Sequence, residues 1–357
     1  MLDIHTVGAG GGSLARFDAG GALRVGPESA GADPGPTCYG RGTQPTVTDA
    51  HLILGRLRAD RFLGGEFRLD LERARRLMAD WLKKQNSRLT LEQFASGVLQ
   101  VVNANMERAL RGVSIERGYD PREFALVAFG GAGGLHACEL AEALSIPTVI
   151  VPAHPGALSA FGILVSDAVK DFSRTLLWNL AGGHPRAELE KEFRKLEAVA
   201  RKEFRSERWS GTLHCERSLD LRYRGQGYEL NIPATGSATA RFHQEHQRRY
   251  GYHHPSKEIE LVTVRLRGKV KAQRLNVAHP KADNARRSSG HAVPVERATV
   301  IFQERHIATP VYERVDLAAE PLLKGPAVIT EYSATTTIPP GKKFWVDRAE
   351  NLLIAIK

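Results

Sequence analysis

The spacing of apolar residues predicts three long helices. Between Leu71 and Gln85, apolar side chains recur every three or four residues, which is the period of one face of an α-helix. The same period runs from Phe94 to Val113. Thr90 precedes this segment, and threonine is a residue type that caps the first turn of a helix. This helix is expected to end near Gly118, because glycine adopts the left-handed conformation that closes helices. The charged segment Pro185–Glu207 predicts the third helix.

Short apolar runs predict strands. Phe124–Ala128 and Thr148–Val151 have the composition of strands buried in a parallel sheet, and the helix-forming stretch Cys138–Leu144 separates them. Together they predict a unit of strand, turn, helix and strand. Towards the C-terminus, alternating and apolar runs predict further strands at 219–223, 228–232, 261–270, 299–302, 327–330, 335–338 and 352–356, the first two forming a hairpin. We also expect a helix at 242–250, a surface loop at 273–294 and a turn at Pro339–Gly341.

With 357 residues, the chain is long enough for two domains that each bury a core. The order of elements predicts an α/β domain over residues 1–176 and a β-rich α+β domain over residues 177–357.

Two glycine-rich segments follow predicted strands. Val7–Ser13 reads V-G-A-G-G-G-S after the extended-looking Asp3–Val7, and Phe129–Ala137 reads F-G-G-A-G-G-L-H-A. A glycine turn between strand and helix exposes backbone N–H groups and admits a ligand, so a nucleotide pocket is predicted. Glycines at such turns also serve tight packing, and that alternative stays open. Neither segment has the dinucleotide fingerprint, and the chain has no P-loop motif.

A group of polar residues surrounds the start of a predicted short helix: Thr46, Thr48, Asp49 and His51. Their side chains can cap backbone N–H groups, which is the plainer interpretation, or hold a hydrated Mg²⁺. If the fold brings the segments together, His5 and Asp3 would join Asp49 and His51 in a metal or proton-transfer group.

Other candidate side chains are weaker. His136 lies in the first turn of a predicted helix, where it could touch ribose or phosphate. Four histidines without cysteine or carboxylate partners at ligand spacing are interpreted as surface residues: His243, His246, His253 and His254. Three cysteines without a C-x-x-C pair indicate reduced thiols, and Cys38 is either a nucleophile or a plain small side chain.

The net charge is +10, but arginines and lysines are mixed with acids along the predicted helices, and no nucleic-acid motif accompanies them. We therefore expect a solvated basic surface that meets an acidic partner or a phosphate-bearing cofactor, and no nucleic acid. No apolar stretch approaches the ~20 residues of a membrane span and no signal-peptide pattern is present, so no membrane association and a cytoplasmic location are expected.

Several motifs, in one order along almost the whole chain, resemble the hydantoinase A and 5-oxoprolinase family. They are Asp3–Ala15, Val25–Gly40, Pro45–Leu57, Val113–Arg122, the glycine turn, Pro155–Gly162 and Arg222–Gln226. One departure is Gly134, where the family usually has proline.

The resemblance implies part of an ATPase domain of the actin, Hsp70 and sugar-kinase type. Family members open cyclic amides such as hydantoins or 5-oxoproline with ATP, and relatives are subunits of ATP-dependent ketone carboxylases. Two D-x-G-G-T loops that hold the ATP phosphates precede the first glycine segment in the family. Because this sequence begins at Met1, shortly before that segment, we expect it to lack both loops and to be inactive alone.

The resemblance also assigns candidate roles, with ATP and Mg²⁺ as cofactors. Adenosine would be bounded by Gly130, Gly131, Gly133 and Gly134, and the cleft would be faced by Gly10, Gly11, Gly12 and Ser13. The catalytic candidates are Ser13, Asp49 and His51, and the metal candidates are Asp49 and His5.

Three interpretations stay open. The chain is one half of a split enzyme that needs a separately encoded N-terminal half, a scaffold for a hydantoinase B type subunit, or a truncated product without activity. The choice between hydrolysis of a cyclic amide and carboxylation of a ketone also stays open.

Overall fold

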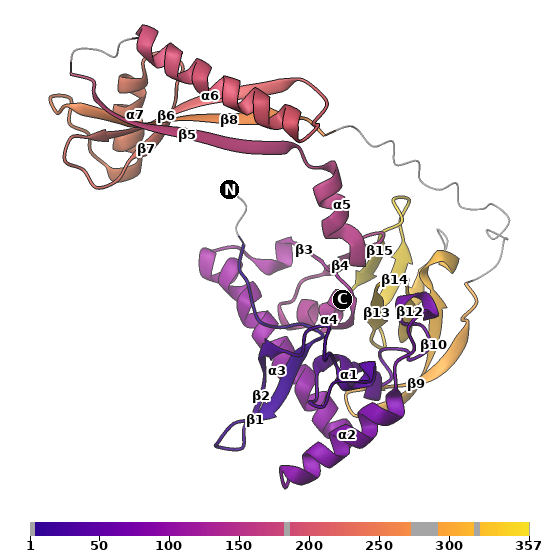
Figure 1. The fold of residues 1–357 in the computed structure, drawn as a ribbon. Coiled ribbons are helices and arrows are strands. Elements are labelled where there is room, and N and C mark those ends of the chain that lie inside the picture. Colours follow the sequence, from indigo (N-terminus) through magenta and orange to yellow (C-terminus); the bar gives the residue numbers. More distant parts are fainter. Residues whose placement is uncertain (1–3, 182–185, 273–291, 318–321, 357) are drawn as a thin grey trace. The chain divides into compact units, whose positions relative to one another are not determined.

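The computed structural model describes residues 4–181, 186–272, 292–317 and 322–356 (Figure 1). The chain forms two compact units, one of Met1–Phe161 with Ala278–Lys357 and the other of Gly162–Val277. This division differs from the expected boundary at residue 176, because the C-terminal strands return to the first unit. The predicted loop at 273–294 lies mostly outside the described residues.

The first unit contains a five-stranded sheet of order β11-β14-β15-β4-β3. The strands β3 (Ala125–Val127) and β4 (Thr148–Val151) are parallel and are connected through α4 (Gly133–Ala143), which confirms the predicted unit of strand, turn, helix and strand. β15 (Leu352–Ala355) pairs antiparallel with β4, and the sheet continues through β14 (Lys343–Val346) and β11 (Leu323–Lys324). Strands distant in sequence therefore share one core with α4.

The edge strand β3 is more exposed than its apolar sequence predicts. Val127 is 49% exposed, and its neighbours Phe124 and Phe129 are 50% and 51% exposed. β3 pairs only with β4, and no other strand of the described residues covers its outer side. The expectation of a buried strand is therefore confirmed for β4, where Val149 and Val151 are buried, and is wrong for β3.

A second sheet of the first unit has the order β13-β12-β10-β9. Its strands are β9 (Glu296–Phe302), β10 (Arg305–Glu313), β12 (Ala327–Thr330) and β13 (Thr335–Ile338). Ala327, Ile329 and Ile338 belong to the same core as α4 and β4. The predicted turn after β13 is present, and Gly341 has a φ of 81° there.

The N-terminal part supplies a hairpin and a helical layer. The hairpin is β1 (Ser13–Phe17) and β2 (Leu23–Ser29), and the helices are α1 (Val47–Ile53), α2 (Leu71–Lys84) and α3 (Leu91–Val113). Both predicted long helices are confirmed, and Thr90 caps α3 reciprocally with Gln93. The left-handed Gly118 closes a 3-10 turn after α3 rather than α3 itself.

The expected N-terminal strand is wrong for the part that the structure describes. Residues 4–7 are irregular, and no described strand pairs with them. The remaining short elements of the first unit and its border are the 3-10 turns Thr37–Tyr39, Phe62–Gly65, Ile115–Arg117, Pro121–Glu123, Pro155–Ala157 and Arg314–Asp316, and the helix α5 (Leu158–Val165). None of the helices that the structure describes is both long and apolar enough to cross a membrane.

The second unit is an antiparallel sheet of order β5-β8-β6-β7 with two helices. The strands are β5 (Ala168–Asn179), β6 (Leu213–Tyr223), β7 (Leu230–Pro233) and β8 (Ile259–Val270), and the helices are α6 (Arg186–Ser206) and α7 (Ala238–Tyr250). Figure 1 shows α6 running along this sheet. Phe193 of α6 and Phe242 of α7 share a core with Leu219 and Leu221 of β6. The predicted hairpin and helices are confirmed.

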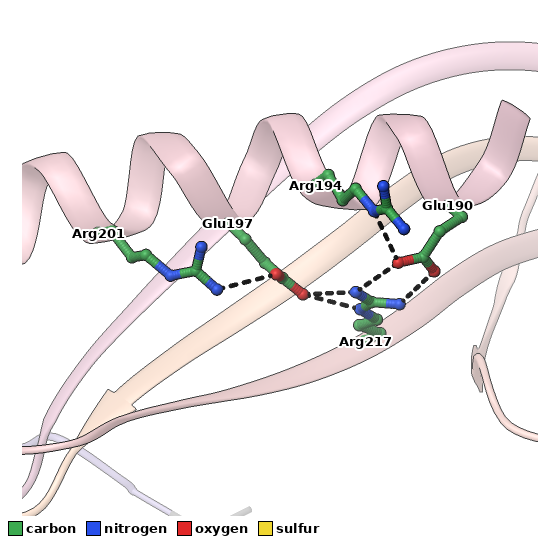
Figure 2. A network of polar contacts seen from close by, with 5 residues as sticks. All are labelled: Glu190, Arg194, Glu197, Arg201 and Arg217. Atoms are coloured by element: carbon green, nitrogen blue, oxygen red, sulfur yellow. Dashed lines mark hydrogen bonds and ion pairs between the residues drawn. The ribbon is translucent and has the colours of Figure 1, made fainter.

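A network of charges joins α6 to β6 (Figure 2). The Arg217 guanidinium donates to Glu190 at 2.7 Å and to Glu197 at 2.6 Å. Arg194 and Arg201 each hold one of these carboxylates as well, at 3.4 and 3.3 Å. The Arg217 hydrogen bond holds the pKa of Glu190 below its usual value. One arginine thus links two turns of the helix to the sheet.

Replacing Arg217 with Met is expected to lower the free energy of unfolding by about 1–2 kcal/mol, because two carboxylates of α6 lose a shared, charge-assisted partner. Urea unfolding followed by circular dichroism measures the change. Arg201→Met is the matched control. It removes a single exposed contact and should cost about 0.5 kcal/mol or less. Equal losses in the two variants would show that Arg217 has no special role.

Candidate functional site

The two glycine segments line one pocket in the first unit, which we call the glycine pocket. It has a volume of about 690 Å³ and lies beside α3, β3 and the start of α4. Gly10 of the first segment and Gly130 and Gly133 of the second segment form part of its wall. Apolar side chains of three elements supply much of the rest: Met106, Leu110, Leu126 and Leu140. An extended apolar surface beside bare backbone suits a flat, largely apolar ligand.

Within the two segments, the glycines fall into two groups. A Cβ atom added to Gly10 or Gly130 would meet no atom within 4 Å, and one added to Gly133 would first meet Ala128 at 3.6 Å. Gly130 also has a φ of 86°, a conformation that by itself favours glycine. The other predicted cofactor-binding glycines lie against protein atoms. An added Cβ would come within 3.1 Å or less of a side chain or backbone at four of them: Gly11, Gly12, Gly131 and Gly134. For this second group, close packing alone explains the absence of a side chain.

Hydrogen bonds hold the first segment in place. The carbonyl of Gly11 accepts from the Thr48 backbone at 2.8 Å and from the Thr48 hydroxyl at 2.9 Å. Within the segment, the Gly10 N–H donates to the buried Ser13 hydroxyl at 3.0 Å, and the Ser13 N–H donates back to the Gly10 carbonyl at 3.0 Å. Ser13 therefore closes the glycine turn, and its catalytic role stays a prediction.

Asp49 caps backbone groups from two segments. Its carboxylate accepts from the N–H groups of Thr37, Cys38 and Thr46 at 3.1, 2.9 and 3.0 Å, and from the Thr46 hydroxyl at 2.8 Å. Thr46 in turn caps α1, so the capping interpretation is confirmed. Since both oxygens of the fully buried Asp49 are engaged, a metal ion would have to displace existing hydrogen bonds.

The described residues do not supply a metal centre. They contain no group of three or more His, Cys, Asp and Glu side chains that could hold a metal ion. Asp3 lies outside the described part. The metal roles of Asp49 and His5 stay predictions, and the donor set does not fit Mg²⁺. Cys38 is buried, and both burial and the neighbouring Asp49 raise the pKa of its thiol, which identifies it as a plain small side chain.

His51 contacts a different histidine from the one predicted. Its Nε2 lies 3.3 Å from Nε2 of His136, and the two rings meet edge to face. Nδ1 of His136 lies 2.7 Å from Oδ1 of Asn103, whose amide donates to Glu139 at 2.5 Å. Arg56 donates to the other Glu139 oxygen at 2.7 Å. These five residues form a hydrogen-bonded chain, which we call the histidine chain, through α1, α3 and α4.

The partners in the histidine chain determine the tautomers. Asn103 must present its amide N–H to the Glu139 carboxylate, so its oxygen faces His136 and accepts from Nδ1–H. Nε2 of His136 is then an acceptor, and His51 donates to it from its own Nε2. Nδ1 of His51 remains a buried acceptor without a partner among the described atoms. With both nitrogens engaged, His136 has no free nitrogen for a ligand in the glycine pocket that it lines, and the expected contact with ribose or phosphate stays a prediction.

Burial keeps both histidines neutral. It is the main reason that the pKa of His136 is lowered to about 4, and it lowers the pKa of His51 well below its usual value. The sequence analysis missed Asn103, Glu139 and Arg56. The segment V-V-N-A-N-M could have indicated Asn103, because polar amides there interrupt the run of apolar residues along α3.

Neutral buried histidines make stability depend on pH. Their pKa is lower in the folded chain than in the unfolded chain, so their contribution is fully present above about pH 6.5 and is lost as the pH falls towards about 4. We expect His136→Leu to reduce this acid-induced loss by about 2–3 kcal/mol relative to the parent chain. Urea unfolding at pH 7.5 and pH 4.5 measures the difference. Leu135→Ala shortens a buried side chain of α4 and removes no titratable group, so it should leave the pH dependence unchanged.

In the second unit, the predicted surface histidines are partly internal. His246 is fully buried, donates to the Tyr252 carbonyl and contacts Gln226, so its assignment to the surface is wrong. The Tyr223 hydroxyl accepts from the His254 N–H and lies 2.7 Å from His243 Nδ1. The tyrosine and glutamine of the family motif Arg222–Gln226 therefore organise the end of this unit.

Two family models match the chain along almost its whole length. The model described as hydantoinase/oxoprolinase matches residues 1–172, and the model of the hydantoinase/oxoprolinase C-terminal domain matches residues 183–354. The chain belongs to the hydantoinase/oxoprolinase family. The resemblance carried by the motifs is confirmed, whereas the expected domain boundary stays a prediction.

Named relatives of this family resemble the chain from end to end. The caprolactamase subunit alpha of Pseudomonas jessenii is 35% identical over 97% of this chain, and the 5-oxoprolinase of Saccharomyces cerevisiae is 33% identical over 96%. A nucleotide-free acetone carboxylase structure, solved in a study of ATP-dependent acetone carboxylation, superposes with a TM-score of 0.82 and 25% identity over 98% of this chain.

The chain matches a smaller share of each relative's own length. The chain spans about half the length of the caprolactamase subunit (51%) and of the acetone carboxylase chain (52%), and 28% of the 5-oxoprolinase. The superposition on the acetone carboxylase chain shows that the two share a fold of mixed helices and sheets. Its assignment to the actin, Hsp70 and sugar-kinase type stays a prediction.

Proposed function

We propose that the chain is part of an ATP-dependent hydrolase that opens cyclic amides, and that the glycine pocket takes the adenosine of ATP. The observation that carries this proposal is the meeting of Gly10, Gly130 and Gly133 at one pocket with no atoms in the way of a side chain. Bare backbone of this kind admits a ligand to van der Waals distance. ATP would supply the phosphoryl group that activates an amide oxygen.

The pocket suits adenosine by shape and polarity. The apolar walls from Met106, Leu110 and Leu140 match the faces of a purine, and the backbone of the glycine turn leaves room at its edge. The histidine chain supports this wall indirectly, because it fixes His136 at the start of α4. In this proposal Ser13, Asp49 and His51 shape and hold the site.

The class of reaction is inferred from the relatives. Two of them are named after cyclic amides, caprolactam and 5-oxoproline, and a solved caprolactamase is described as ATP-dependent. These names favour hydrolysis of a cyclic amide. The acetone carboxylase likeness supports the alternative, in which the chain belongs to an ATP-dependent ketone carboxylase. Mg²⁺ would need donors beyond those of the described residues, so we route no step through it.

Nucleotide binding tests the pocket. Gly133→Val should abolish adenosine binding, measured by calorimetry, while the melting temperature changes little, because the new Cβ atom meets only an ordinary contact. For Gly134→Ala we expect the opposite outcome, a loss of stability rather than a loss of adenosine binding. Its Cβ would lie 2.3 Å from the Thr336 hydroxyl oxygen and should cost about 1–3 kcal/mol of stability. Unchanged adenosine affinity in Gly133→Val would show that the glycines serve packing alone, and would favour the scaffold interpretation.

A multi-subunit complex is the second part of the proposal. Relatives are named as an alpha subunit of caprolactamase and a beta subunit of acetone carboxylase. The exposed edge of β3, flanked by Phe124 and Phe129, is a surface on which another strand can pair. A hydantoinase B type subunit and a separately encoded N-terminal half are the partners that we propose.

Association tests this second part. On its own the chain should self-associate, and co-expression with a hydantoinase B type subunit or an N-terminal half should yield a defined complex in analytical ultracentrifugation. Val127→Lys, on the exposed edge, should weaken either association, whereas Val169→Lys, at a comparably exposed valine of the second unit, should not. A monodisperse monomer that ignores both partners would refute the proposed complex.

A further inference from the structure

The loop between β12 and β13 lies directly against the second glycine segment. A Cβ atom added to Gly131 would lie 3.1 Å from the Ser333 carbonyl oxygen, and one added to Gly134 would lie 2.8 Å from the Thr335 carbonyl oxygen. The Thr335 N–H also donates to the Gly131 carbonyl at 3.4 Å. We call residues 331–335 the support loop, because two glycines of the segment rest on its backbone.

The support loop also meets the turn that follows β4. A Cβ atom added to Gly156 in that turn would lie 2.7 Å from the Ser333 carbonyl oxygen. The Pro155 carbonyl, in the same turn, accepts at 2.8 Å from the N–H of Gly130, which lines the glycine pocket. Ser333 therefore packs against the backbone that follows both parallel strands, β3 and β4. A shift of the support loop would move the wall of the pocket, because close-packed atoms transmit displacement.

A buried ion pair holds the first residue of the support loop. The Arg314 guanidinium donates to the Glu331 carboxylate at 2.7 Å, and the two side chains are 10% and 11% exposed. The other terminal nitrogen of Arg314 donates to the carbonyls of Val151 and Glu350, each at 2.7 Å. Val151 ends β4, and Glu350 lies shortly before β15. Arg314 thus connects the loop of one sheet to two strands of the other sheet.

The chemistry of this contact favours a role in position over a role in stability. A buried ion pair is weak evidence for stability, because the loss of hydration offsets the attraction. Burial raises the pKa of the Glu331 carboxyl, and Arg314 opposes that shift. The guanidinium presents its N–H groups in a fixed plane, so its two terminal nitrogens reach three acceptors on different elements at once. The pair therefore fixes one orientation of the support loop.

We propose that Arg314 is a positioning residue for the glycine pocket, and that it acts through Glu331 and the support loop. The ion pair holds the loop, and the loop holds the glycine segment in the conformation that leaves the backbone of Gly130 and Gly133 bare at the pocket. This inference rests on the proposed function, since it takes the glycine pocket as the adenosine site. The ion pair is a second support for that site, beside the histidine chain.

Calorimetric titration of adenosine into variants of the full chain tests the proposal. Glu331→Ala removes the anchor of the support loop. If the binding conformation is then populated about one tenth of the time, the apparent affinity for adenosine falls about tenfold. Glu331→Gln keeps an acceptor for Arg314 and should bind adenosine as the parent chain does. Glu296→Ala is the matched control, because Glu296 of β9 binds Arg58 at 3.0 Å in the same way, and it should leave adenosine binding unchanged.

Hydrogen exchange measures the position of the glycine segment without a ligand. In Glu331→Ala, we expect the amides of residues 129–137 and 152–157 to exchange about tenfold faster than in the parent chain, while those of α2 keep their rates. Urea unfolding shows which variants are folded. If Glu331→Ala does not fold, Arg314→Lys supplies the same test, because it keeps the charge and loses the planar fork.

The outcomes separate the two proposals. Unchanged adenosine affinity in Glu331→Ala, an equal loss in Glu296→Ala, or a loss that Glu331→Gln does not restore would overturn the positioning role. Faster exchange throughout the first unit would overturn it as well, because the ion pair would then serve stability alone. If the parent chain binds no adenosine, the nucleotide pocket of the proposed function is refuted, whereas faster exchange confined to residues 129–137 and 152–157 would still support the positioning role.

Discussion

The contact between His51 and His136 is the interaction on which the site depends. His51 belongs to α1, whose first turn holds the Gly11 carbonyl through Thr48. His136 belongs to α4, which begins in the second glycine segment. A hydrogen bond between two neutral imidazoles therefore sets the separation of the helices that carry the two segments. Asn103, Glu139 and Arg56 make this arrangement specific, because each partner in the histidine chain permits one orientation of the next.

Neutrality is the physical condition for that contact. A proton on either ring would place a charge at a site from which water is excluded, and a proton on Nε2 of His136 would also remove the acceptor that the hydrogen bond needs. Arg56 is the only cationic side chain in the histidine chain, and Glu139 compensates its charge. The site thus buries polar groups without burying an uncompensated charge. One described polar atom of the histidine chain, Nδ1 of His51, is buried without a hydrogen-bond partner.

The topology of the first unit places the glycine pocket beside the exposed edge strand β3. α3 lines the glycine pocket, and β3 forms the outer limit of the sheet beside it. An apolar strand that is half exposed, next to a pocket with bare backbone, is typical of a surface that functions against another molecule. We propose two such molecules, a small ligand in the glycine pocket and a protein on the edge of β3.

Local sequence information determined much of the secondary structure. The periods of α2 and α3, the Thr90 cap, the β3-turn-α4-β4 unit and the hairpin of the second unit all follow from neighbouring residues, and so does the capping role of Asp49. The motifs also identified the family, because their order along the chain is specific. The boundaries of these elements depend on interactions within a few residues, which a sequence displays directly.

Contacts between distant segments were decided only by the tertiary structure. His51 and His136 are 85 positions apart, and no pattern near either indicates the other. The return of β15 to β4 joins the C-terminal strands to the first unit, a contact that no local pattern indicates. All the glycines of the two segments look equivalent in sequence, but Gly10, Gly130 and Gly133 face a cavity while Gly11 and Gly134 face protein atoms. Such differences arise because packing depends on which surfaces meet in space, and sequence alone does not record that.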